Sequence, residues 1–226
     1  MTIVNAVEIA PQNNRTIINI VLDETGSMNS CRDSTISSFN EYINSQKNLE
    51  GECLVSLTMF SLAWGSSPET YVRDSYRNLP ISNVPDLTPD KFVPNGGTNL
   101  YDAIGSTIRR IEKTVDSRDN ILVVIITDGD ENSSREYTLD NIKTLVSEKE
   151  KEGWTFVYLG ANQDAWQVGA RFGLSKGQTM TYDVANMAGT MATLNAATTS
   201  YRSVRVGGMN ASSVEKNFFG DDNAKS

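Results

Sequence analysis

Apolar runs and apolar stripes alternate along this 226-residue chain, and together they predict a sheet covered by helices. Short apolar runs have the length of buried strands, and in most of the intervening stretches apolar residues recur every three or four positions, as on the inner face of a helix. Strands that alternate with helices are typical of a largely parallel sheet. The pattern therefore predicts an α/β fold: a three-layer, doubly wound, mostly parallel sheet of about six strands, with helices on both faces.

The expected elements follow from these runs and stripes. Strands are expected at 17–22, 54–60, 70–76, 121–127, 154–159 and 178–182. The segments 54–60 and 70–76 have little helical sequence between them, so we expect one antiparallel pair, joined by a loop near Trp64 and Gly65. Helices are expected at 33–43, 100–115, 139–152, 162–172 and 183–201. Asp33 or Ser34 is expected to cap the first of them.

The chain is predicted to form one domain with additions at both ends. Residues 1–16 are expected to be an N-terminal extension, 17–182 the domain, 183–206 an added helix packed on it, and 207–226 a flexible tail. The methionines of the added helix recur at helical spacing, which favours docking on the domain. The segment 79–95 holds four of the six prolines and is expected to be a surface loop.

Composition excludes several classes of function. The net charge is −8, with 28 acidic against 20 basic residues, which argues against nucleic acid as a partner. No apolar run approaches the roughly 20 residues of a membrane span, and no secretory signal begins the chain, so a cytoplasmic location is expected. The chain has no histidine and two cysteines, which excludes Ser-His-Asp catalysis and argues against a structural zinc site.

Short oxygen-bearing side chains occur where three segments leave the predicted sheet. Asp23, Thr25 and Ser27 follow the first strand, Thr98 follows two glycines, and Asp128 ends the central strand. The carboxyl ends of parallel strands meet at one edge of a sheet, which is where such folds assemble their sites. If the chain turns sharply after the first strand, the alternating side chains at 23, 25 and 27 face one side, while Glu24 faces elsewhere.

Two carboxylates and three hydroxyls form a donor set that suits a hard divalent cation. Mg²⁺ prefers oxygen ligands and keeps several waters, and Mn²⁺ or Ca²⁺ could take its place. Each piece alone is a weak signal, because Asp128 followed by glycine is also typical of a simple turn. A metal site is indicated because all three segments occur in this order along the chain.

Three motifs carry a resemblance to a known family. They are Asp-Glu-Thr-Gly-Ser-Met at 23–28, Gly-Thr-Asn-Leu-Tyr-Asp at 97–102 and Thr-Asp-Gly at 127–129. Together they resemble the metal-ion-dependent adhesion site of von Willebrand factor A-like domains, the family that includes integrin inserted domains. The resemblance covers about 17–182. The stretch from 160 to about 182 also resembles stand-alone bacterial and phage members of this family.

The resemblance implies a role for each candidate residue. Thr25, Ser27 and Thr98 would bind the metal directly, whereas Asp23 and Asp128 would act largely through bound water. Thr25 stands where serine is usual, and its hydroxyl keeps the same ligand chemistry. The family's metal bridges to a carboxylate of a partner, so the resemblance implies a protein-binding module whose Mg²⁺ accepts an Asp or Glu from a protein partner, and no catalysis.

Two other functions stay open. The same pieces could belong to a Mg²⁺-dependent phosphotransferase or phosphatase of the haloacid-dehalogenase-like type, with Asp23 as the nucleophile. In that class a second aspartate typically stands two residues later, where this chain has Thr25. Alternatively, the chain could be a metal-independent scaffold in a larger assembly. The sequence names neither the partner nor the oligomeric state.

Three acidic residues near these motifs have alternative interpretations. Asp102 either orients the loop or lies in the first turn of its helix, where a negative charge is favourable, and the second interpretation is favoured. Asp130 and Glu131 either strengthen the negative field around the metal or are simply solvated.

Overall fold

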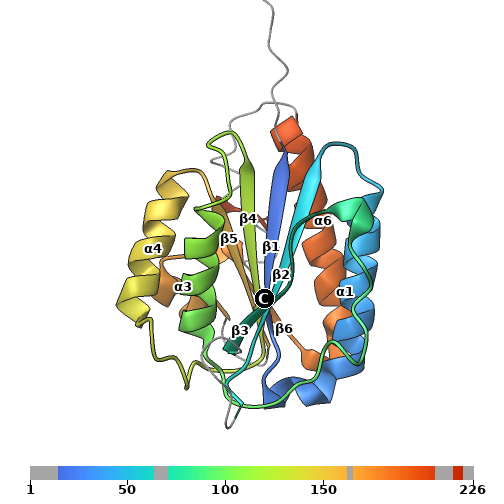
Figure 1. Ribbon diagram of the computed structural model, residues 1–226. Coiled ribbons are helices and arrows are strands. Elements are labelled where there is room, and N and C mark those ends of the chain that lie inside the picture. Colours follow the sequence, from blue (N-terminus) through green and yellow to red (C-terminus); the bar gives the residue numbers. More distant parts are fainter. Residues whose placement is uncertain (1–14, 64–70, 162–164, 207–215, 221–226) are drawn as a thin grey trace, which may run out of the picture.

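A six-stranded sheet forms the centre of the molecule (Figure 1). The computed structural model describes residues 15–63, 71–161, 165–206 and 216–220. The strand order is β3-β2-β1-β4-β5-β6, and only the β2–β3 pair is antiparallel. The strands are β1 (Thr16–Asp23), β2 (Cys53–Phe60), β3 (Val72–Pro80), β4 (Asn120–Thr127), β5 (Thr155–Ala161) and β6 (Thr179–Tyr182). The predicted sheet is confirmed, including its single antiparallel pair.

Helices cover both faces of this sheet and complete three layers. They are α1 (Arg32–Lys47), α3 (Leu100–Ile111), α4 (Leu139–Lys151), α5 (Ala165–Phe172) and α6 (Met187–Val206). Short 3₁₀ turns lie at η1 (Gly26–Cys31), η2 (Ile81–Asn83), η3 (Lys176–Gln178) and η4 (Val184–Asn186). Figure 1 shows α1 and α6 on one face, with α3 and α4 on the other. The predicted α/β class is therefore confirmed.

The central strands are buried on both faces, as expected for a parallel sheet between two helical layers. In β1, Ile18 and Ile20 join the core beneath α1 and α6, while Ile17 and Val21 join the core beneath α3 and α4. Successive side chains of a strand point to opposite faces, so one strand supplies both cores. Because both faces are buried, the pairing register of β1 with β2 and β4 is strongly specified, and this register sets where the ends of these strands lie relative to one another.

The edge strand β3 is longer than the sequence pattern predicts. It continues to Pro80, because β2 pairs with it along nearly its whole length, from Phe60 opposite Val72 to Leu54 opposite Pro80. Proline is tolerated at the end of an edge strand, where its missing N–H breaks no ladder. The rest of the predicted loop at 79–95 holds the short turn η2 and is otherwise irregular, yet Val84, Leu87 and Phe92 are buried in the core. This segment is a packed cover over α1 and is not a free surface loop.

Two helix starts also differ from the predictions. Helix α1 begins at Arg32, directly after η1, and no side chain caps it, so the expected cap at Asp33 or Ser34 is wrong. Before α6, Asp183 accepts a hydrogen bond from the Ala185 N–H and starts η4, which leads into the helix. In both places a 3₁₀ turn precedes the α-helix and moves its start, which periodicity does not reveal.

Some predictions fall outside the described residues. These are most of the N-terminal extension, the loop at Trp64 and Gly65, the start of the helix at 162–172, and all of the tail at 207–226 except 216–220. Within the described part of the chain, no helix combines the length and the apolar character needed to span a membrane.

Candidate metal centre

The three candidate segments meet at the carboxyl edge of the sheet. Strands β1 and β4 are neighbours with Leu22 opposite Ile126, so the residues that follow them leave the sheet side by side. The segment before Thr98 is tied to the same edge by backbone hydrogen bonds. The Gly26 N–H donates to the Gly96 carbonyl at 3.1 Å, and the Gly97 N–H donates to the Leu62 carbonyl at 3.0 Å.

Hydrogen bonds link the side chains of these segments. The Thr25 N–H donates to Asp23 Oδ1 at 2.7 Å, the hydroxyls of Thr25 and Ser27 are 3.1 Å apart, and Ser27 donates to Asp128 Oδ1 at 2.6 Å. Thr98 joins them across Gly129. A Cβ added to Gly129 would lie 3.0 Å from the Thr98 hydroxyl and 3.7 Å from that of Ser27. The structure therefore brings all five predicted residues together, and the glycine is what lets Thr98 approach.

The cluster is buried at its base and open at its outer side. Asp23, Thr25 and Thr98 are at most 3% exposed. Asp128 is half-buried and Ser27 is exposed. Among the five residues of the cluster, Ser27 and Asp128 are therefore the ones that a group from another molecule could reach.

The two carboxylates lack a cation partner within the described residues, since no ion pair there involves Asp23 or Asp128. Burial raises the pKa of Asp23 to about 6, against the opposing effect of hydrogen bonds from Thr127 and Thr25. Burial also raises the pKa of Asp128, although the Ser27 hydroxyl lowers it. A bound divalent cation would compensate both charges, so the residues present fit a metal of this kind.

The donor set of the cluster contains only two acidic side chains and no cysteine or histidine. Across the described residues, no group of three or more acidic, cysteine or histidine side chains could hold a metal. The cluster is instead rich in neutral hydroxyls, which favours a hard cation bound with moderate charge neutralisation.

Glu24 faces away from the cluster, as its alternating position predicts. Its carboxylate accepts hydrogen bonds from Arg73 Nη2 at 2.7 Å and from the Val93 N–H at 2.7 Å. The Asn95 N–H donates to its backbone carbonyl at 2.9 Å. Glu24 therefore ties the first loop to β3 and to the segment that carries Thr98.

Thr127 has a role that sequence reasoning missed. Its hydroxyl donates to Asp23 Oδ2, and the Gly129 N–H donates to Thr127 Oγ1 at 3.2 Å. Thr127 thus holds the first aspartate and shapes the turn that carries Asp128. The Thr-Asp-Gly motif contained this residue, but its spacing gave no sign that the hydroxyl crosses to a neighbouring strand.

Asp102 and Glu131 organise the third loop. The Asp102 carboxylate accepts hydrogen bonds from three consecutive N–H groups at 135–137, at 2.8 to 2.9 Å. Asp102 lies in the first turn of α3, as the favoured interpretation has it, and it also orients the loop, as the other interpretation proposed. Glu131 accepts from the N–H groups of Ser133, Ser134 and Tyr101, so it is not simply solvated. Asp130 is exposed.

Comparisons with known proteins find similarity only at the level of structure. No family model matches the sequence, and no curated protein does. Among solved structures, proximal thread matrix protein 1 from the mussel byssus superposes with a TM-score of 0.56 at 14% identity, over 82% of this chain and 46% of that chain. This chain therefore spans just under half the length of the mussel protein. Another structure of that protein has a zinc-occupied MIDAS motif, the metal-ion-dependent adhesion site.

Two further solved structures are similar to this chain over most of its length. A von Willebrand factor type A protein from Catenulispora acidiphila gives a TM-score of 0.51 at 13% identity, over 82% of this chain and 42% of that chain. The pilus adhesin SpaC from Lactobacillus rhamnosus GG gives 0.64 at 14% identity, over 81% and 30%. This chain has a von Willebrand factor A-like fold. Sequence identities this low support a shared fold and nothing more. The assignment to the stand-alone bacterial or phage type stays a prediction.

Proposed function

We propose that this chain is a divalent-metal-dependent protein-binding module. Asp23, Thr25, Ser27, Thr98 and Asp128 would hold Mg²⁺, with the three hydroxyls as direct ligands and the two carboxylates acting largely through water. Mn²⁺ or Ca²⁺ could replace it. The partner would be a protein that presents an Asp or Glu side chain to the metal.

One observation carries this proposal: the hydrogen-bonded chain Thr25–Ser27–Asp128 joins two loops and opens to solvent at Ser27. Neutral hydroxyls closest to the metal leave more of its positive charge uncompensated than directly bound carboxylates would. When bound, the metal would supply a Lewis-acidic position for an incoming carboxylate. The exposed side at Ser27 is where a partner's side chain could enter.

Calorimetric titration with Mg²⁺ and Mn²⁺ tests the site. We expect the double variant Asp23→Ala and Ser27→Ala to lose metal binding while keeping its fold, because both residues lie at the edge of the sheet. A matched control is Ser37→Ala with Asp140→Ala, which removes the same two side-chain types at exposed positions outside the cluster. Equal affinity in the double variant and the wild type would refute the site assignment.

The phosphotransferase alternative is less well supported. A nucleophilic aspartate must reach its substrate, but Asp23 is fully buried and hydrogen bonds hold both of its oxygens. An assay with aryl phosphates separates the two functions. Turnover that disappears in Asp23→Asn would favour the enzyme, whereas no turnover in the wild type is expected for a binding module.

The scaffold alternative differs in its dependence on metal. Pull-down with the wild type and with Asp23→Ala, each with and without a chelator, distinguishes the two. We expect the partner to be lost in Asp23→Ala and lost from the wild type when the chelator is added. A partner retained in all four conditions would support a metal-independent scaffold. A cytoplasmic location also stays a prediction, to be checked by cell fractionation.

A further inference from the structure

The backbone of Thr98, a predicted metal ligand, is held by hydrogen bonds to the loop that follows β4. The Thr98 N–H donates to Asn132 Oδ1 at 3.0 Å. The Thr98 carbonyl accepts from the N–H groups of Asn132 and Ser133, both at 3.0 Å. Both polar backbone groups of Thr98 are therefore bound by one short stretch of the loop that also carries Asp128.

The Thr98 side chain has no such support of its own. Within the described residues no hydrogen bond involves its hydroxyl, although Thr98 is only 3% exposed. A β-branched side chain has few χ1 rotamers, so the direction of its hydroxyl follows from the position of the backbone. Whatever holds the Thr98 backbone therefore also orients its hydroxyl.

The amide of Asn132 is itself held in one orientation. The Ser133 hydroxyl donates to the same Oδ1 atom that accepts from the Thr98 N–H. Two donors at one atom identify it as the amide oxygen, because the amide nitrogen can only donate. Ser133 is fixed in turn, since its N–H also donates to Glu131 Oε1 at 2.9 Å. Asn132 thus presents a preformed acceptor to Thr98.

The two loops approach each other closely beside this contact. A Cβ added to Gly97 would overlap the Ser133 hydroxyl and would lie 3.1 Å from Asn132 Oδ1. Glycine is therefore required here, and the packing leaves Thr98 little freedom to move while Asn132 holds it.

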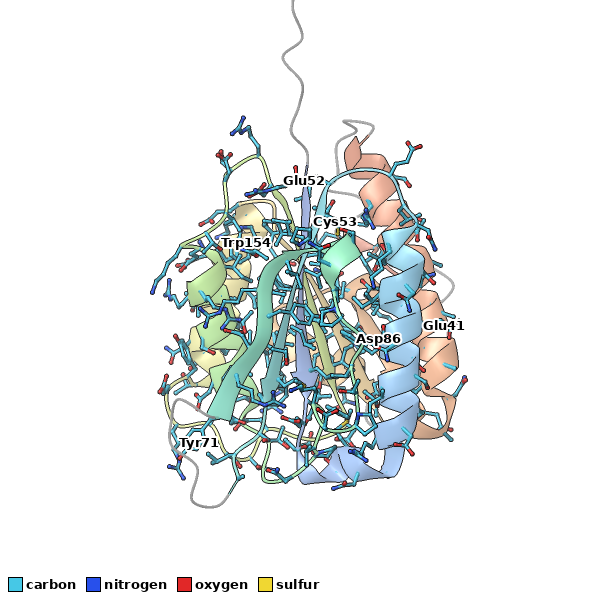
Figure 2. All side chains as sticks on the ribbon, turned by 45° about the vertical axis from the view of Figure 1, so that its right-hand side comes forward. Glu41, Glu52, Cys53, Tyr71, Asp86 and Trp154 are labelled. Carbon is cyan, nitrogen blue, oxygen red and sulfur yellow. The ribbon has the colours of Figure 1, made fainter. Side chains whose placement is uncertain are left out.

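The residue after Thr98 is held from the other side. Asn99 Nδ2 donates to the Tyr71 carbonyl at 3.2 Å. Figure 2 shows Tyr71 at the end of the sheet opposite to Cys53, with which β2 begins, so this contact lies at the carboxyl edge. Asn99 anchors the start of α3 in this way, but the side-chain contact to Thr98 itself comes from Asn132.

We propose that Asn132 is a positioning residue of the metal centre. Its amide oxygen holds the Thr98 backbone, orients the Thr98 hydroxyl within the cluster and thereby raises the affinity for the metal. This inference rests on the proposed function, which makes Thr98 a direct ligand. Without the acceptor, the Thr98 N–H loses its partner where little water can replace it, so the segment would shift.

Amide hydrogen exchange with EDTA present tests the contact, and calorimetric titration with Mg²⁺ tests its consequence. In Asn132→Ala the Thr98 amide should exchange about tenfold faster than in the wild type. Mg²⁺ binding should weaken by about 10–100-fold, the usual cost of losing a group that orients a metal ligand. A melting curve with EDTA present checks that the variant is folded.

Asn132→Asp keeps an oxygen acceptor at the same place, and it should restore slow exchange of the Thr98 amide and Mg²⁺ binding at least as tight as in the wild type. A variant that only disturbed the loop would not be rescued in this way. The exchange measurement contains no metal, so attraction between the added charge and the cation does not affect it. Asn44→Ala, at an exposed position of α1, is the control and should match the wild type in both measurements.

The outcomes separate this inference from the proposed function. Equal Mg²⁺ affinity, or equal Thr98 exchange, in Asn132→Ala and the wild type would overturn the inference and leave the proposed function standing. A wild type that binds neither Mg²⁺ nor Mn²⁺ would overturn the proposed function, and this inference with it.

Discussion

At the scale of single residues, the Asp23 carboxylate is held on both sides by protein groups. The Thr25 N–H binds one oxygen and the Thr127 hydroxyl binds the other. Both donors lie within the buried part of the site, where a hydrogen bond to a charged group is strong. The orientation of this aspartate is therefore set by the protein before a metal binds.

Replacing Thr127 with valine should weaken metal binding without unfolding the chain. Valine keeps the shape of threonine but cannot donate to Asp23, and loss of a residue that orients a metal ligand typically costs about 10–100-fold in affinity. Thr127→Ser keeps the hydroxyl and should bind within about threefold of the wild type. Calorimetric titration with Mg²⁺ measures both, and an unchanged affinity in Thr127→Val would contradict this role.

The raised pKa of Asp23 predicts how the metal-free protein responds to pH. Its folded pKa of about 6 lies above the ordinary value of 3.8, so between these values the folded chain binds more protons at this residue than the unfolded chain does. The contribution of Asp23 to stability is thus fully present below about pH 4 and is lost as the pH rises through 6.

Urea denaturation of the wild type and Asp23→Asn, with EDTA present, isolates this effect from the other titrating groups. The wild type should gain stability relative to the variant as the pH falls from 7.5 to 5. A difference between the two proteins that stays constant over this range would show that the Asp23 pKa is not raised.

At the scale of elements, hydrogen bonds between polar side chains hold α6 against α1. Arg202 is 3% exposed, and it donates to the Gln46 carbonyl at 2.8 Å, at the last turn of α1. Gln46 in turn donates to Asn195 Oδ1 at 2.7 Å. A cation at the C-terminal end of a helix interacts favourably with the helix dipole, so Arg202 both docks α6 and caps α1.

Replacing Arg202 with methionine should loosen this docking. Methionine keeps most of the apolar stem but removes the hydrogen bonds that Arg202 donates to the Gln46 carbonyl and, at 3.1 Å, to Gln46 Oε1, which should lower the free energy of unfolding by about 2 kcal/mol. Urea denaturation measures the loss. Lys143→Met, at an exposed position of α4, is the control and should change stability by less than about 0.5 kcal/mol.

At the scale of the whole molecule, the metal cluster joins loops that follow different strands, so metal binding should stabilise the complete fold. A ligand that binds only the folded state at 100 times its Kd adds about 2.7 kcal/mol. We expect saturating Mg²⁺ to raise the melting temperature by several degrees, and to leave the Asp23→Ala and Ser27→Ala double variant unchanged. An equal rise in both proteins would indicate binding elsewhere.

The amino-acid pattern is enough to establish the alternation of strands and helices and the three segments that carry the site. Apolar periodicity reports which face of an element is buried, and the carboxyl ends of parallel strands must share one edge. The grouping of Asp23 and Asp128 therefore follows from the sequence alone, whereas Thr98 comes after the antiparallel strand β3 and reaches the same edge only because the segment at 81–97 returns to it. The loop glycines are also visible in the sequence, because close approach of a backbone requires them.

Which side chains hold these segments in place depends on the folded packing. Thr127 reaches Asp23 from a neighbouring strand, Asp102 binds N–H groups more than 30 residues away, and Arg202 reaches the end of α1. The extension of β3 to Pro80 likewise depends on pairing with β2. A local pattern records burial and turn chemistry, but a hydrogen bond between distant segments exists only once the packing of the sheet and helices has brought its two partners together.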